Sequence, residues 1–285
     1  MLNKISGTAL LVAGLLALAG CQEIEKTVPT GRYSLTLQAT KGAGTKSLEL
    51  SGNTLNAKWV SGEQVAVCLE STVLGYLTVT AVSDDKATLS GTVSSISGIQ
   101  GGAVLTLVYP RMGWEYSGQD GTLKYVSDNC DYAIAKVEIS EVNGSTVTTT
   151  ADADFINQQS IFNFSFSSND NTLGVKSLTI SSEQNKLVSS CSYSTDWQST
   201  YGDILVSANG AKSVYVAIRN ENLDADDSFS FDLVDSNSQT YLGSKSISAA
   251  NLGYGKFLSA SGITMNQVNI AKIPGKQITD EGCIL

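Results

Sequence analysis

The sequence has 285 residues, a formal net charge of -9 at pH 7 and no histidine. A chain this acidic lacks the basic stripe that neutralises phosphates, which excludes a nucleic-acid-binding protein. The absence of histidine removes the commonest general base and metal ligand, and with them the serine–histidine–aspartate triad. We therefore expect a protein that is not an enzyme and that uses neither a metal nor another cofactor.

The first 21 residues have the pattern of an export signal. Lys4 stands near the start, an apolar run from Ala9 to Ala19 follows, and small residues precede Cys21. The run is too short to span a bilayer, as is typical of a signal peptide. Leu18-Ala19-Gly20-Cys21 resembles the lipobox of bacterial lipoproteins, so we expect cleavage between Gly20 and Cys21 and acylation of the Cys21 thiol. The acyl chains would anchor the precursor in the outer membrane. A buried N-terminal helix is the alternative.

Beyond a polar tether at 21–31, segments that alternate apolar and polar residues recur along the chain. This period of two is typical of antiparallel sheets with one buried face, and no long helical period competes with it. We therefore predict an all-β protein. The alternating segments lie at 33–38, 64–69, 76–82, 87–93, 104–109, 132–139, 161–166, 175–180, 204–206, 214–218, 229–233 and 256–265.

A polar stretch at 151–159 separates two sets of these segments. Each set is long enough to build a sandwich with a core of its own. The predicted organisation is a signal peptide at 1–20, a lipidated tether with the first strand at 21–46, an N-terminal β-sandwich at 47–157 and a C-terminal β-sandwich at 158–285.

Several motifs follow one another in a characteristic order. After the lipobox and the strand from Tyr33 to Thr40 come Thr45-Lys46-Ser47-Leu48 and then Trp59-Val-Ser-Gly62-Glu. The second half opens with Ser160-Ile-Phe162-Asn-Phe164, and Leu252-Gly-Tyr-Gly255-Lys256-Phe257 leads into the last strand. This ordered set resembles the fimbrillin family of Bacteroidetes, the subunits of type V pili and their relatives.

The resemblance implies two transthyretin-like β-sandwiches and a role in pilus assembly and adhesion at the cell surface. In the family, a lipoprotein precursor reaches the outer membrane, and a trypsin-like protease removes its first strand. A donor strand of another subunit then fills the groove. Here the removable strand would carry Tyr33, Leu35 and Leu37 on one face. An ordinary first strand that is never removed is the alternative.

The protease site implied by the resemblance lies after Lys46. The family has Arg at this point, so an Arg-selective protease would cut this chain poorly, whereas a broader trypsin-like protease would still cut. Lys41 is the nearer alternative site. Arg32 precedes the strand, so cleavage there would remove the lipid and keep the strand.

The donor strand implied by the resemblance lies in the tail, with Ile263, Met265, Val268 and Ile270 as the side chains that fill the groove. Pro274 ends any long strand there. Since this tail is short and only partly alternating, a pilus tip or anchor subunit is an alternative to a stalk subunit.

A surface lipoprotein that binds glycans or host ligands without polymerising is the alternative function. Trp59, Trp114 and Trp197, with Tyr116 and Tyr193, carry rings that can stack on sugars. Core packing is the better interpretation of Trp59. Trp114 lies in a Gly-rich stretch that we expect to be exposed, which makes it the candidate ligand contact.

The remaining cysteines and acids carry weaker signals. Cys68, Cys130, Cys191 and Cys283 allow three disulfide connectivities in an exported chain, although Cys68 also fits as a small buried hydrophobe. Two acidic clusters have ligands for Ca2+, but neither has the spacing of a calcium loop, so we expect solvated acids. The clusters are Asp152 with Asp154, and Asp224 with Asp226 and Asp227.

Overall fold

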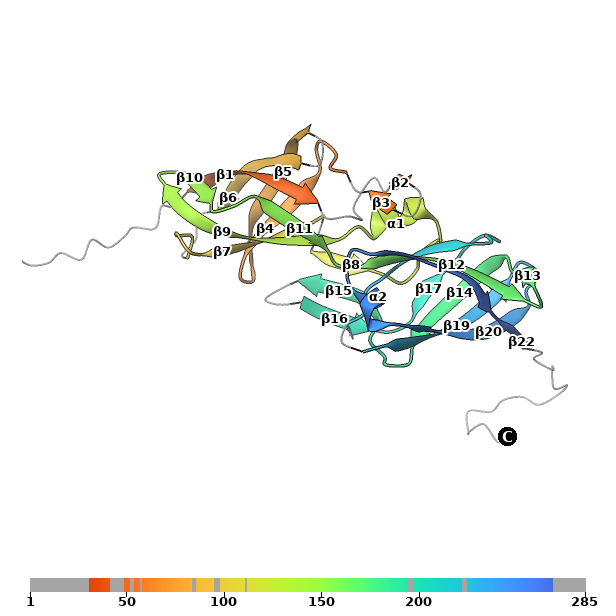
Figure 1. The fold of residues 1–285 in the computed structure, drawn as a ribbon. Coiled ribbons are helices and arrows are strands. Elements are labelled where there is room, and N and C mark those ends of the chain that lie inside the picture. Colours follow the sequence, from red (N-terminus) through yellow and green to blue (C-terminus); the bar gives the residue numbers. More distant parts are fainter. Residues whose placement is uncertain are drawn as a thin grey trace, which may run out of the picture.

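The computed structural model shows a chain built almost wholly of strands, in two lobes (Figure 1). The all-β prediction is confirmed. In the described part of the chain, no helix has both the length and the apolar character that crossing a membrane requires. The structure describes residues 31–41, 49–51, 54–56, 58–83, 86–94, 98–110, 112–193, 197–221 and 225–268.

The first lobe is one eight-stranded sheet in the order β10-β1-β11-β9-β7-β4-β5-β6. The sheet closes on itself because β1 also pairs with β6, which gives a barrel where a β-sandwich was predicted. Strands β10 and β11 lie end to end between β9 and β1. The strands are β1 (Arg32–Lys41), β4 (Gln64–Leu69), β5 (Thr72–Ser83), β6 (Lys86–Ser94), β7 (Val104–Tyr109), β9 (Ala133–Asn143), β10 (Thr146–Thr149) and β11 (Ala153–Asn157).

Alternation explains the barrel, because every second side chain points inward to a common core. That core contains the inward residues of β1 together with Val67, Leu77, Leu89 and Leu107 from other strands. At Gly91 a Cβ atom would stand 2.3 Å from the carbonyl oxygen of Tyr76. Any larger residue here would clash with β5, so only glycine permits this close approach of β5 and β6. Glycine inside a strand often marks a place where another backbone comes this near.

The second lobe packs two sheets against each other. One has the order β13-β12-β18, with β21 parallel to β12, and the other has the order β17-β14-β19-β20-β22. Phe162, Phe164 and Phe166 of β12 meet Phe229 and Phe231 of β19 in the core between the sheets. The strands are β12 (Ser160–Ser168), β13 (Asn171–Thr172), β14 (Val175–Ser182), β17 (Ile204–Val206), β18 (Val214–Ile218), β19 (Asp227–Asp235), β20 (Thr240–Ile247), β21 (Phe257–Thr264) and β22 (Asn266–Val268).

A segment from the first half of the sequence lies with the second lobe. Strand β8 (Gly113–Glu115) pairs with β15 (Val188–Tyr193), which pairs in turn with β16 (Trp197–Tyr201). The short helix α1 (Leu123–Asn129) follows β8 and is capped by the hydroxyl of Thr122. The remaining elements are the hairpin β2 (Glu49–Ser51) with β3 (Thr54–Asn56), and the helix α2 (Ala249–Leu252).

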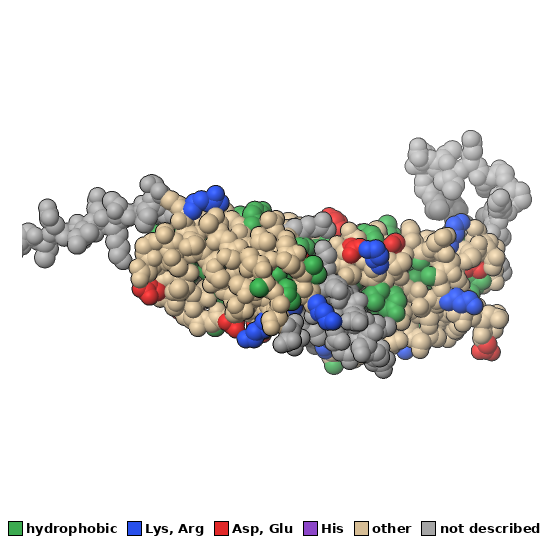
Figure 2. All heavy atoms as spheres, turned by 90° about the horizontal axis from the view of Figure 1, so that it is seen from above, with side chains coloured by type: hydrophobic (Ala, Val, Ile, Leu, Met, Phe, Trp, Pro, Cys, Tyr) green, Lys and Arg blue, Asp and Glu red, His purple; other side chains and the backbone are tan. Residues whose placement is uncertain are grey.

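Charged side chains are scattered on the face of the molecule drawn in Figure 2. Lysine, arginine and acidic side chains appear there singly or in small groups among uncharged polar side chains, backbone and a few apolar side chains. Exposed apolar side chains such as Val82 and Ile156 belong to different strands. Isolated apolar side chains on a surface are ordinary and mark no binding site by themselves.

Candidate functional site

Strand β1 completes the barrel. Along its length it pairs antiparallel with β6, from Arg32 opposite Ser94 to Thr40 opposite Lys86. Its other edge pairs in parallel, first with β10 and then with β11. Among the strands that the structure describes, β1 is the one that joins these two edges into a closed ring.

The two faces of β1 differ as the sequence predicts. Tyr33, Leu35, Leu37 and Ala39 are buried in the barrel core, and the residues between them face solvent. On the outer face, the hydroxyls of Thr36 and Ser90 lie 2.8 Å apart, and Gln38 Nε2 donates to Thr88 Oγ1 at 3.0 Å. The prediction that Tyr33, Leu35 and Leu37 share a face is confirmed.

Lys41, the last residue of β1, continues the inward series. Its side chain is 1% exposed, although its backbone is partly accessible. The ammonium Nζ lies 4.0 Å from the ring centroid of Trp59 and 4.1 Å from that of Tyr109, and it pairs with Glu63 Oε2 at 3.4 Å. We call Trp59, Tyr109 and Glu63 the lysine cage.

A tight turn builds one side of the lysine cage. Gly62 adopts a φ of 90°, and its amide donates to the carbonyl oxygen of Val79 at 2.9 Å. The turn brings Glu63 back beside Trp59, so the Val60 amide donates to Glu63 Oε2 at 2.9 Å. This is the Trp-x-x-Gly-Glu motif, whose contact with Lys41 the sequence analysis missed.

Electrostatics favour a cation in the lysine cage. The Tyr109 hydroxyl donates to Glu63 Oε1 at 2.6 Å. Burial, followed by the negative charges of Asp131 and Glu63, raises the pKa of Tyr109 far above its usual value, so the phenol stays a donor. Contact of a cation with an aromatic face contributes about 0.5–2 kcal/mol, and removing one partner of a buried ion pair costs about 3–5 kcal/mol. The lysine cage therefore holds the C-terminal end of β1.

The predicted protease sites differ in accessibility. Arg32 is exposed at the start of β1, whereas the Lys41 side chain is enclosed by the lysine cage. A trypsin-like protease inserts a basic side chain into its own pocket, so Lys41 must leave the lysine cage before it can be recognised. Lys46 lies outside the described residues, as do Gly20 and Cys21.

The predicted donor residues lie largely in the core of their own lobe. Ile263 and Met265 are buried, and Val268 is partly buried in β22, which pairs with β20. The Met265 amide donates to the carbonyl oxygen of Ser167 at 2.8 Å. Ile270 lies outside the described residues. In this chain, Ile263 and Met265 therefore already have an intramolecular packing role.

The prediction that Trp114 is exposed is wrong. The residue is 1% exposed, because β8 pairs with β15 and the indole stacks on Tyr132 at a centroid distance of 5.0 Å. So enclosed a ring has no face for a sugar. The core interpretation of Trp59 is confirmed by edge contacts with Tyr109 and Phe155. The side chains of Tyr193 and Trp197 lie outside the described set.

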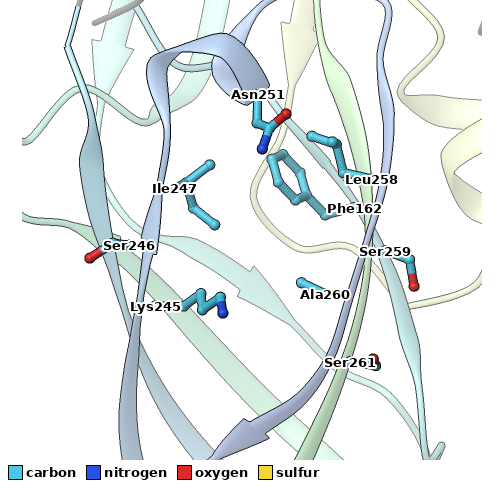
Figure 3. Close-up of a pocket in the computed structure, with 9 residues that line it drawn as sticks. All are labelled: Phe162, Lys245, Ser246, Ile247, Asn251, Leu258, Ser259, Ala260 and Ser261. Carbon is cyan, nitrogen blue, oxygen red and sulfur yellow. The ribbon is translucent and has the colours of Figure 1, made fainter.

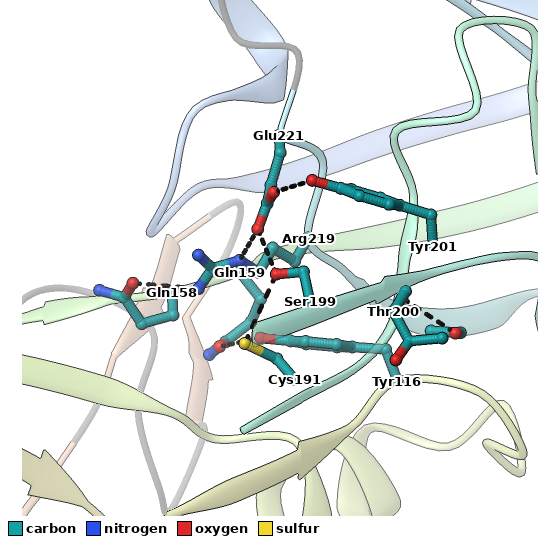
Figure 4. A network of polar contacts seen from close by, with 10 residues as sticks. Tyr116, Gln158, Gln159, Cys191, Ser199, Thr200, Tyr201, Arg219 and Glu221 are labelled. Atoms are coloured by element: carbon teal, nitrogen blue, oxygen red, sulfur yellow. Dashed lines mark hydrogen bonds and ion pairs between the residues drawn. The ribbon is translucent and has the colours of Figure 1, made fainter. Parts of the chain in front are cut away.

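A polar network surrounds the buried Arg219 and includes residues of the second lobe and of the connection between the lobes (Figure 4). The guanidinium donates to Gln158 Oε1 at 3.2 Å and to Glu221 Oε1 at 3.3 Å. Glu221 also accepts hydrogen bonds from Ser199 and Tyr201, each at 2.5 Å. Because Gln158 lies in the connection between β11 and β12, this network fixes that connection against β15 and β16. Tyr116 donates to Gln159 nearby, at 3.3 Å.

A small cavity of about 270 Å³ opens where the two sheets of the second lobe separate (Figure 3). Lys245 and Ile247 of β20 line one side, and Leu258 and Ala260 of β21 line the other. The ring of Phe162 lies between Ile247 and Leu258. The lining combines apolar and hydroxyl side chains with one lysine and one asparagine, and these residues form no cluster of catalytic groups.

The thiols and acids of the described residues have structural surroundings. Cys68 and Cys191 are free and buried, and burial raises the pKa of the Cys68 thiol to about 11. Cys130 is buried and contacts the carbonyl oxygen of Glu115; Cys283 lies outside the described residues.

The acidic clusters separate in the fold. Asp152 pairs with Lys86, Asp154 accepts from Thr40, Asp226 accepts from the Ala249 amide, and buried Asp227 accepts from Ser182 and Asn220. Asp224 is outside the described part. Within that part, no three histidine, cysteine or acidic residues gather in an arrangement that would hold a metal ion.

Comparisons with known proteins find likeness in structure alone. No protein-family model and no curated protein matches the sequence. The chain resembles a candidate cell adhesion protein of Bacteroides ovatus, with 13% identity, a TM-score of 0.47 and coverage of 84% of this chain and 97% of that one. It also resembles a fimbrial protein of the same species, with 11% identity, a TM-score of 0.36 and coverage of 81% and 49%.

A further structural neighbour is the tip fimbrial protein Mfa3 of Porphyromonas gingivalis with a C-terminal truncation. The identity is 9%, the TM-score is 0.34, and the match covers 75% of this chain and 81% of that one. These three structural neighbours are fimbrial and cell adhesion proteins of Bacteroidetes.

Proposed function

We propose that this chain is a subunit of a surface fimbria that mediates adhesion, and that it assembles when a strand of another subunit replaces β1. The supporting observation is that, among the described strands, β1 alone closes the barrel. Loss of β1 would leave unpaired backbone groups on β6, β10 and β11 and would open the positions that Tyr33, Leu35 and Leu37 occupy. An incoming strand satisfies both needs.

The proposed precursor is a lipoprotein held in the outer membrane by acylated Cys21. A trypsin-like protease then cuts after Lys46, so that the lipid leaves together with β1. The accessibility of the other sites supports this choice. Lys41 is enclosed, and a cut after Arg32 would leave the whole of β1 in the barrel except its first residue.

The proposed scaffold is the pair of transthyretin-like domains that the sequence resemblance implies. The facing sheets of the second lobe support this interpretation there. The burial of Ile263 and Met265 argues against their transfer to a neighbouring subunit, because their departure would open the core of their own lobe. The proposed donor is therefore a segment beyond residue 268 or a strand of a different subunit.

N-terminal sequencing of surface material, combined with unheated gel electrophoresis, tests this function. The proposal expects a chain that begins at Ser47 and runs in high-mass species that heating dissociates. Lys46→Gln should retain the longer form and lose those species, while the exposed control Lys58→Gln should behave as wild type. Material that always begins at Cys21 and remains monomeric would contradict the proposal and identify a lipoprotein that does not polymerise.

A further inference from the structure

The inner face of β1 ends in a charge. Its inward positions follow at every second residue, with Tyr33, Leu35, Leu37 and Ala39 in the apolar core and Lys41 in the lysine cage. If β1 leaves the barrel, the ammonium leaves as well, and a carboxylate and two aromatic faces remain at that end. This consequence rests on the function proposed above.

We propose that the groove left by β1 selects an incoming strand by a basic residue at one end. That strand carries large apolar side chains at three alternate positions, a small one at the fourth, and lysine at the fifth. Strand β1 is itself the seated template for this pattern, since it occupies every position of the groove.

The position that the Lys41 ammonium would leave requires another cation, because a carboxylate and two aromatic faces surround it. The Glu63 side chain is 9% exposed, and its charge acts on Tyr109 together with that of the buried Asp131. A neutral side chain at this position would leave Glu63 without the ammonium that it faces now at 3.4 Å. Charge complementarity of this kind discriminates between partners, because a mismatched strand leaves a buried charge without a counter-charge.

The small fourth position follows from the neighbouring strands. Ala39 stands between Ala87 of β6 and Ala153 of β11, and all three are buried. Ala39 is 0% exposed, so the close-packed atoms of the barrel core lie directly against its methyl group. A leucine at this place would overfill the barrel.

The chain's own tail fits this pattern poorly. Aligning Lys272 with Lys41 puts Ile270 at the small position, and Asn266 and Thr264 at two of the large apolar positions. The pattern therefore favours a donor from a different kind of subunit over a second copy of this chain.

Peptide rebinding to the cut full-length chain tests the selection. A recognition site for a sequence-specific protease is placed between residues 41 and 49, and the cut protein is unfolded in urea and refolded with a labelled peptide of residues 32–41. The native peptide should bind, and Lys41→Met and Lys41→Glu peptides should bind at least about tenfold more weakly. An Ala39→Leu peptide should also bind weakly, and an outward-facing Gln38→Met peptide should match the native one.

The same peptides on a Glu63→Gln protein give the decisive comparison. The difference in affinity between the native and Lys41→Met peptides should shrink, because the carboxylate that pairs with the lysine ammonium is absent. Equal binding of these two peptides to the wild-type protein would overturn the selection, as would equally tight binding of a peptide of residues 264–272. Should Glu63→Gln fail to refold, the peptide series on the wild-type protein still decides.

Failure of the proposed function has a different signature. In that case the cut chain never exchanges β1 for added peptide under native conditions, whereas peptides still rebind after unfolding and the lysine preference is still measured. Exchange without any preference for lysine would reject the selection and leave strand replacement intact.

Discussion

Lys41 and Glu63 form a buried ion pair, with Nζ 3.4 Å from Oε2, and it links the end of the first strand to the turn before β4. The indole of Trp59 and the ring of Tyr109 flank the ammonium. Strand β1, whose departure we propose, is thus held at its C-terminal end by the contacts of Lys41. Along its length it is held by four buried side chains, which we call the apolar row: Tyr33, Leu35, Leu37 and Ala39.

The apolar row should dominate the stability of the closed barrel. Leu35 is fully buried, so Leu35→Ala should lower the free energy of unfolding by about 2–5 kcal/mol, because it leaves a cavity in the barrel core. Urea unfolding followed by circular dichroism measures this. Gln38→Ala, on the outer face of the same strand, should change stability by less than about 1 kcal/mol. Equal losses of unfolding free energy in Leu35→Ala and Gln38→Ala would show that the buried side chains of β1 do not stabilise the closed barrel.

The lysine cage should protect Lys41 from proteolysis. In brief trypsin digestion of the folded chain, followed by mass spectrometry, cleavage after Lys41 should be slower than after Arg32, whose side chain is exposed. Trp59→Leu should increase the rate at Lys41 selectively, because one aromatic wall is lost. Rapid cleavage after Lys41 in the wild-type chain would contradict the enclosure.

The Arg219 network should make stability depend on acid pH. Burial alone raises the pKa of Glu221, but hydrogen bonds from Ser199 and Tyr201 and the charge of Arg219 outweigh it, so the pKa lies below its usual 4.5. A pKa lowered by folding means that the folded state binds fewer protons. The contribution is complete above about pH 4.5 and disappears as the pH falls through the folded pKa.

Urea midpoints measured from pH 7 to pH 3 test this dependence. The wild-type chain should lose more stability over this interval than Glu221→Gln, while the exposed control Glu183→Gln should follow the wild type. If Glu221→Gln shows the same fall as the wild type, the carboxylate contributes nothing to the acid sensitivity.

The tail residue Ile263 should stabilise the unassembled chain. Because it is buried against β12, Ile263→Ala should reduce the free energy of unfolding of the monomer by about 2–5 kcal/mol. Val268→Ala, at a partly buried site, should cost less. No loss of monomer stability in Ile263→Ala would return this residue to the role of a donor side chain, as the sequence resemblance implied.

Local patterns account for what the sequence predicts well. The alternation of Tyr33, Leu35 and Leu37 identifies β1 and its buried face, because a period of two is a property of the strand itself. The closure of the barrel depends on pairing β1 with strands more than 40 residues away, such as Ser94 opposite Arg32, and no local pattern encodes that. Register across such distances is a property of the whole sheet.

The candidate site also depends on contacts between residues that are far apart in the sequence, and these contacts were not predicted. A lysine after an alternating strand is ordinarily interpreted as exposed, so the enclosure of Lys41 was missed, although Trp59 and Glu63 stood in a recognisable motif. Trp114 was predicted to be exposed because glycine surrounds it. Its burial comes from the pairing of β8 with a strand some 75 residues later, which brings the indole onto Tyr132.

Covalent closure of β1 tests the central claim most directly. The hydroxyls of the paired residues Thr36 and Ser90 lie 2.8 Å apart, so cysteines at both positions are placed to join β1 to β6 through a disulfide. Cells producing this double variant should display monomers in unheated gels under oxidising conditions. Reduction should restore the high-mass species, and Thr36→Cys alone should assemble normally. High-mass species formed with the disulfide intact would show that assembly does not require β1 to leave.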